Sequence, residues 1–262
     1  MTAPKPAAPV TDASLALGVA YGDHPRHRLD LCVPARPNGA VAVIAASGWT
    51  DAPRAEARGA MLALAEAGWA SALCDLRGPN QTRDPGELVR DLRAGAAKAW
   101  DEALAAGADD QGIALIGVGA GAWVALATAL EWPATRDART PRLRALVGIG
   151  LPGAGDPAVL TGAGVAGARF LAPLGDPRTA DPTRLPPTLL LHGESDPDAP
   201  LRLTRELAER YAAAGAECRL ASMPGAGRLG ERHESLAVLT SFLGEHAAAR
   251  PAVPVFAGRI PE

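Results

Sequence analysis

The chain has 262 residues, which fits one large α/β domain or two small ones. Apolar residues make up 48% and charged residues 21%, with a formal net charge of -3, a composition typical of a soluble globular protein. It excludes a disordered chain, a collagen-like repeat and a basic nucleic-acid-binding surface. Aromatic residues are only 4%, whereas there are 29 Gly and 24 Pro. We therefore expect a core packed largely with small side chains and a chain rich in turns.

The N-terminal segment does not resemble an export signal. Residues 1–20 contain one Lys, and their apolar piece, Leu15–Ala20, follows Asp12 rather than a basic region. Elsewhere charges or prolines interrupt every apolar run before the roughly 18 residues that a membrane helix needs. We expect a cytoplasmic protein that contacts neither a membrane nor nucleic acid.

The cysteines are few, odd in number and far apart: Cys32, Cys74 and Cys218. No pair has the short spacing of a zinc or redox motif. We expect free, buried thiols, no metal and no cofactor.

From Arg28 onward, short apolar runs alternate with longer helical patterns, as in a parallel sheet covered by helices. The predicted strands are Leu29–Val33, Val41–Ala46, Ala70–Asp75, Ile113–Ile116, Ala145–Ile149, Thr188–Leu191 and Cys218–Met223. The predicted helices are Arg54–Ala67, Glu87–Ala106, Ala122–Glu131, Leu201–Ala214 and Glu234–Ala247. The predicted fold class is α/β, a mostly parallel central sheet of about eight strands with helices on both faces.

The same pattern gives the domain organisation. Residues 21–249 form a single domain, preceded by an extension, residues 1–20, and followed by a tail, residues 250–262, both poorly packed. Within the domain, residues 151–187 are rich in Gly, Pro and Asp and are expected to form a small lid or an irregular excursion.

A glycine-rich turn follows the predicted strand Ile113–Ile116 and precedes a helix, with Gly117, Gly119 and Gly121 in alternate positions. Open parallel sheets bind their ligands at the carboxyl ends of strands, where this turn lies. The segment resembles the Gly-x-Ser-x-Gly turn of the α/β-hydrolases, except that glycine stands where the serine nucleophile belongs.

Three further stretches carry the resemblance to that superfamily. They are Tyr21-Gly22-Asp23 followed by Arg28–Pro34 (RLDLCVP), then Leu190–Pro200 (LLHGESDPDAP), and Met223–Gly227 (MPGAG). Together they are similar, over roughly residues 20–247, to the esterase/lipase group that includes carboxylesterase-like and kynurenine-formamidase-like enzymes. The resemblance implies an α/β-hydrolase fold.

The resemblance also implies which residues occupy the catalytic positions. Asp196 takes the place of the acid, Gly119 that of the nucleophile and Arg228 that of the histidine. A serine hydrolase needs both a hydroxyl and a base, and neither is in its expected place. His233 is the substitute base if the preceding loop folds back, whereas His192 is expected to support its loop.

The oxyanion-hole loop of the group corresponds to Ala45–Trp49, in which the usual histidine and first glycines are missing. Backbone N–H groups near Ser47, Gly48 and Trp49 are expected to converge with that of Ala120 on a bound carbonyl or carboxylate oxygen. Weak substitutes for the nucleophile are Ser47 itself, Ser195 and Cys74, none of which has the spacing of a hydrolase serine. We interpret Cys74 as a buried structural thiol.

Two hypotheses for the function stay open. In the first, the protein is a degenerate hydrolase that keeps a cleft for a small molecule or a protein partner. In the second, Asp196 and His233 activate water for ester or amide hydrolysis, or for a lyase reaction, without a serine. A third, weaker interpretation is a dinucleotide site at Gly117-x-Gly119-x-x-Ala122, although no acidic residue ends the next strand. A homodimer is compatible with all three.

Overall fold

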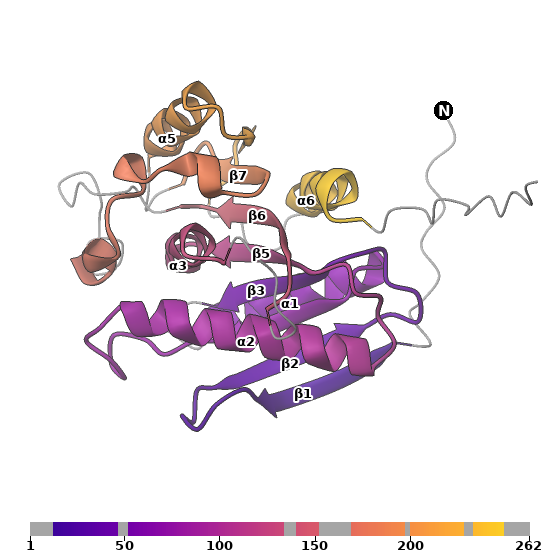
Figure 1. Ribbon diagram of the computed structural model, residues 1–262. Coiled ribbons are helices and arrows are strands. Elements are labelled where there is room, and N and C mark those ends of the chain that lie inside the picture. The colour runs from indigo at the N-terminus through magenta and orange to yellow at the C-terminus, as the bar shows by residue number, and fades with distance from the viewer. Residues whose placement is uncertain are drawn as a thin grey trace, which may run out of the picture.

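The computed structural model describes residues 13–46, 52–133, 140–151, 169–196, 200–227 and 233–248 (Figure 1). Within these ranges eight strands form one sheet in the order β1-β2-β4-β3-β5-β6-β7-β8. Their bounds are β1 Ser14–Ala20, β2 Arg28–Val33, β3 Val41–Ala46, β4 Ser71–Asp75, β5 Ile113–Val118, β6 Leu143–Ile149, β7 Thr188–Gly193 and β8 Cys218–Met223. The predicted α/β fold class is confirmed.

Strands β3 to β8 are mutually parallel, while β2 runs antiparallel to both β1 and β4. The carboxyl ends of the six parallel strands therefore meet at one edge of the sheet. The pairing of Leu29 with Cys74 brings the β1–β2 connection to that edge as well. We call it the carboxyl edge; it is where an open parallel sheet positions a ligand site.

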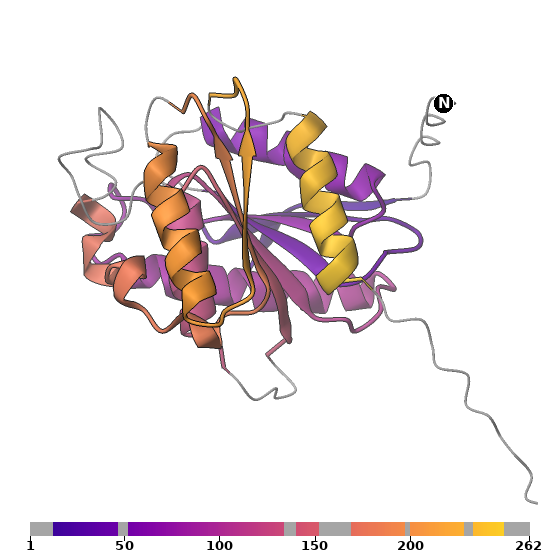
Figure 2. The same cartoon turned by 90° about the horizontal axis from the view of Figure 1, so that it is seen from above.

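Helices cover both faces of the sheet, as Figure 2 shows from above. On one face lie α2 Gly86–Ala105, α3 Ala120–Leu130 and α5 Leu201–Ala213, and on the other lie α1 Ala52–Glu66 and α6 His233–His246. Successive side chains of a strand point to opposite faces of the sheet and so contribute to two hydrophobic cores. In β3, Val41 and Val43 pack with the first set of helices, and Ala42 and Ile44 pack with the second. Both faces of β3 are thus buried, as a parallel sheet requires.

Each predicted strand and helix is present, with its ends within two residues of the prediction. The prediction missed β1, which lies in the segment assigned to a poorly packed extension. Its side chains are mostly exposed, Leu15 at 53% and Leu17 at 58%, so little core-facing pattern marks it in the sequence. Backbone pairing with β2 fixes it instead, from Ser14 opposite Val33 to Ala20 opposite Arg28.

Of the expected excursion between β6 and β7, residue 151 and residues 169–187 are described. Residues 169–171 are helical, and short 3₁₀ turns follow at Ala172–Leu174, Pro177–Thr179 and Pro182–Arg184. Asp176 and Asp181 begin the second and third of these turns, each accepting a backbone N–H two residues ahead. The segment packs against α3 and α5.

Candidate functional site

The turn between β5 and α3 has the unusual backbone that the glycine pattern predicts. Gly119 adopts φ 57° and ψ -124°, a conformation that strains any residue with a side chain. Its N–H donates to the carbonyl of Ile149 at 2.8 Å, and its own carbonyl accepts from the N–H of Ala122 at 2.9 Å. The neighbouring strand and the new helix thus fix the turn from both sides.

The three glycines of this turn have different steric roles. A Cβ on Gly117 would lie 2.6 Å from the backbone nitrogen of Ala122, and one on Gly121 would lie 2.5 Å from the carbonyl oxygen of Ala45. Chain neighbours aside, a Cβ on Gly119 would have no atom of the described residues within 4 Å. The flanking glycines therefore permit close backbone packing, whereas no described residue crowds the central one at the carboxyl edge.

Asp196 lies at the same edge, in the turn after β7. Its N–H donates to the carbonyl of Gly193 at 3.1 Å, and its side chain is 5% exposed. One carboxylate oxygen, Oδ2, is 3.5 Å from the point that a Cβ on Gly150 would occupy. Gly150 directly follows Ile149, whose carbonyl accepts the N–H of Gly119. The structure therefore brings the predicted acid and the predicted nucleophile position to the ends of β7 and β5, the two strands that flank β6.

His192 is completely buried at the end of β7, where it supports the loop that carries Asp196. Its Nδ1 is 2.8 Å from the hydroxyl of Thr204 on α5, and its Nε2 is 4.0 Å from Asp196 Oδ2. A histidine enclosed in this way cannot reach a substrate above Gly119. Its predicted role in supporting the loop agrees with this geometry.

Several predicted site residues lie outside the described residues. These are Ser47, Gly48 and Trp49 of the oxyanion-hole loop, and Arg228. The backbone of His233 is described as the first residue of α6, but its side chain is not. Of the predicted site the structure therefore describes Asp196, Gly119 and Ala120, the last being the first residue of α3.

The carboxyl edge also carries an ionic cluster that sequence reasoning missed. The guanidinium of Arg77, just after β4, is forked onto the buried carboxylate of Asp91 on α2, with Nη2–Oδ1 at 2.7 Å and Nε–Oδ2 at 2.9 Å. Glu87 pairs with the same guanidinium at 2.9 Å, and Nε2 of His27 lies 3.0 Å from Asp91. Every member has a partner, so the cluster ties β4, α2 and the β1–β2 connection together rather than presenting reactive groups.

Cys74 near the end of β4 is unsuited to act as a nucleophile. It is fully buried, and desolvation, with a smaller contribution from the charge of Asp75, raises its pKa to about 12. A thiol this hard to ionise is inert at neutral pH, as its interpretation as a structural residue predicts.

The described part of the chain contains no group of three or more His, Cys, Asp or Glu side chains arranged to hold a metal ion. None of its helices combines the length and apolar character needed to cross a bilayer.

Comparison with known proteins indicates the structural class of the fold. No family model matches the sequence, and no curated protein is significantly similar to it. Solved structures are similar in fold. A truncated carbohydrate esterase from gut microbiota is 19% identical with a TM-score of 0.71, covering 92% of this chain and 99% of its own.

Two bacterial esterases are similar to the chain in fold to a comparable degree. Esterase B from Lactobacillus rhamnosis is 18% identical with a TM-score of 0.67, covering 90% of this chain and 87% of its own. Esterase 2 from Thermogutta terrifontis, with propionate bound, is 21% identical with a TM-score of 0.67, covering 91% and 96%. At these identities the similarity establishes the fold, which is the α/β-hydrolase fold of these esterases.

Proposed function

We propose that this protein is a hydrolase-fold protein without hydrolase activity, and that it binds a small molecule bearing a carbonyl or carboxylate group at the carboxyl edge, above Gly119. The observation that carries the proposal is the turn itself. Its backbone has the strained form that presents a nucleophile in this fold, yet the residue at its centre has no side chain, and no described residue outside the turn crowds it.

The missing groups explain why we propose binding rather than catalysis. Acyl transfer through a serine needs a hydroxyl and an imidazole about 3 Å apart, and the sequence places Gly119 and Arg228 at these two positions. Asp196 keeps the position of the acid, but an acid that orients a histidine has no such partner at residue 228.

The remaining features of the turn suit an oxygen-bearing ligand. Helix α3 starts directly after Gly119, and the N–H groups of its first turn are directed toward the carboxyl edge. The helix dipole adds a partial positive charge there, which favours a carbonyl oxygen or a carboxylate. Binding at this point needs no side chain at residue 119.

Propionate, which is bound in the Thermogutta terrifontis esterase 2 structure, is a suitable probe. In a ¹H–¹⁵N NMR titration we expect saturable shifts of the Gly119 and Ala120 amides, and none at Gly107, a glycine of similarly open surroundings in the turn after α2. Absence of saturation at Gly119, or equal shifts at Gly107, would contradict the proposed site.

The hydrolytic alternative is tested by turnover of short-chain p-nitrophenyl esters. Our proposal predicts that the wild-type rate equals that of the heat-denatured protein. A higher rate that Asp196→Asn abolishes would replace the proposal with hydrolysis that depends on Asp196.

A further inference from the structure

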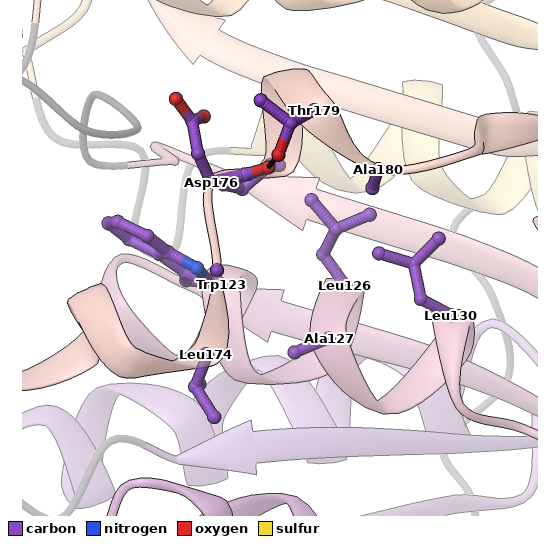
Figure 3. Close-up of a pocket in the computed structure, with 10 residues that line it drawn as sticks. Trp123, Leu126, Ala127, Leu130, Leu174, Asp176, Thr179 and Ala180 are labelled. Atoms are coloured by element: carbon purple, nitrogen blue, oxygen red, sulfur yellow. Dashed lines mark hydrogen bonds between the residues drawn. The ribbon is translucent and has the colours of Figure 1, made fainter.

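The outer face of α3 carries an apolar stripe that runs away from the candidate site. Trp123, Leu126, Ala127 and Leu130 have the i, i+3, i+4, i+7 spacing that places side chains along one face of a helix. They line one wall of a cavity of about 200 Å³ (Figure 3). We call this cavity the α3 pocket. Its wall begins one helical turn beyond Gly119.

The opposite wall is the segment that contains the first two 3₁₀ turns, with Leu174, Pro177 and Ala180 facing the pocket. This segment is fixed to the rest of the molecule. Leu171, just before it, is completely buried, and the hydroxyl of Tyr211 on α5 donates to the carbonyl of Pro177 at 2.8 Å. The pocket is therefore formed without a ligand, which removes one cost of binding.

The described residues that line the α3 pocket present no free charge to it. Asp176 is the ionisable residue in its wall, and in Figure 3 the carboxylate points away from the side chains of α3. It accepts bonds from the backbone N–H of Arg178 at 2.9 Å and from the guanidinium Nη2 of Arg178 at 2.7 Å. Partial burial alone would raise the pKa of Asp176, but these bonds lower it, so the carboxylate stays ionised and paired. What faces the cavity is chiefly carbon.

We propose that the α3 pocket is a second binding site, for a compact, uncharged, apolar molecule about the size of one aromatic ring. An enclosed engineered apolar cavity of about 150 Å³ in another protein holds benzene. The α3 pocket, about 200 Å³ and open to solvent on the side of the exposed Gly175 and Thr179, has the volume for a ring with one substituent. A folded protein partner would need a contact of roughly 800 Å² on each side, far more than this pocket offers. A charged ligand would lose its hydration without gaining a partner. This proposal goes beyond the function proposed above and does not depend on it.

Toluene is the probe, with benzoate as its charged counterpart of similar shape. In ¹³C-methyl and ¹⁵N NMR titrations of the full chain, we expect toluene to shift the methyl signals of Leu126 and Leu130 and the indole N–H signal of Trp123 in a saturable way. Benzoate is expected to bind at least tenfold more weakly. Equal binding of the two compounds, or no saturation by toluene up to its solubility, would overturn the proposal.

Matched variants locate the site. Ala180→Phe fills the pocket, whereas Ala172→Phe adds the same ring at an exposed position of the same segment that does not line it. We expect Ala180→Phe to weaken toluene binding at least tenfold and Ala172→Phe to leave it within twofold of wild type. Thr179→Phe, from an exposed lining position, is a second filling variant in case Ala180→Phe does not fold. Undiminished binding in a folded filling variant would contradict the assigned site. Propionate shifts at Gly119 report separately on the carboxyl edge.

Discussion

No described residue would crowd a side chain at Gly119, which sets it apart from the glycines on either side of it. At Gly117 and Gly121 a Cβ would collide with backbone atoms, so no other residue fits there without movement of α3. At Gly119 the cost of a side chain comes from the backbone conformation alone. The packing of the fold therefore explains two of the three glycines but not the central one.

Alanine substitutions separate these two kinds of glycine. Gly119→Ala is expected to lower the free energy of unfolding by about 1–2 kcal/mol, the cost of a left-handed backbone for a residue with a Cβ. Gly107→Ala, also at positive φ with open surroundings, is expected to cost the same. Gly117→Ala is expected to cost about 3 kcal/mol or more, because its Cβ would press on the backbone of Ala122. Urea unfolding measures all three, and a larger loss at Gly119 than at Gly117 would contradict this account.

For single residues, the sequence predicts where a residue lies in the fold better than it predicts which side chains that residue contacts. Asp196 and Gly119 lie at the same edge of the sheet, on either side of the end of β6, as their places after β7 and β5 imply. The partners of Asp91 were not predictable, because Arg77 follows β4 and His27 lies in the β1–β2 connection, and only the assembled fold brings both to α2. The contact of His192 with Thr204 depends likewise on the packing of α5 against β7.

Among the elements, α2 is joined to the carboxyl edge by the ionic cluster of Arg77, Asp91, Glu87 and His27. Asp91 is 3% exposed and accepts from the Arg77 backbone N–H at 3.2 Å as well as from its guanidinium. Removal of the negative charge would leave the guanidinium of Arg77, 17% exposed, with Glu87, itself 30% exposed, as its ionic partner among the described residues. Buried pairs of this kind are costly to break from one side.

Asp91→Asn is therefore expected to lower the free energy of unfolding by about 3–5 kcal/mol. Glu206→Gln is the control. It breaks the pair of Arg202 and Glu206 on α5, whose side chains are 54% and 55% exposed, and is expected to change stability by less than about 0.5 kcal/mol. Chemical denaturation of both variants at neutral pH measures the difference. Equal effects would show that burial of the cluster does not stabilise the fold.

Strand and helix positions were predictable where apolar and polar residues alternate with the period of the element, or where an apolar run forms a strand buried on both faces, as in β3. Strand β1 was not, because its exposed side chains carry little of that signal and its stability comes from backbone pairing with β2. The hydrophobic periodicity of the sequence likewise did not indicate the 3₁₀ turns between β6 and β7. Two of them begin with Asp-Pro, and only the structure shows that Asp176 and Asp181 cap these turns with their side chains.

For the whole molecule, the order of motifs along the chain was enough to predict the fold. Parallel strands place every strand-to-helix connection from β3 onward at one edge, so the sequence of motifs translates directly into a site location. Chemistry does not follow from that location, since one fold supports many functions. In this protein the fold is the α/β-hydrolase fold, whereas the function that we propose is binding.

The central claim is that the turn at Gly119 keeps its backbone form without a nucleophile. A fluorophosphonate probe, which reacts with activated serines, tests it by intact-protein mass spectrometry, with an active serine esterase as the positive control. The account predicts no adduct on the wild-type protein under conditions that label the control completely. A stoichiometric adduct on the wild-type chain would show that an activated nucleophile exists elsewhere in the site, and the claim would be wrong.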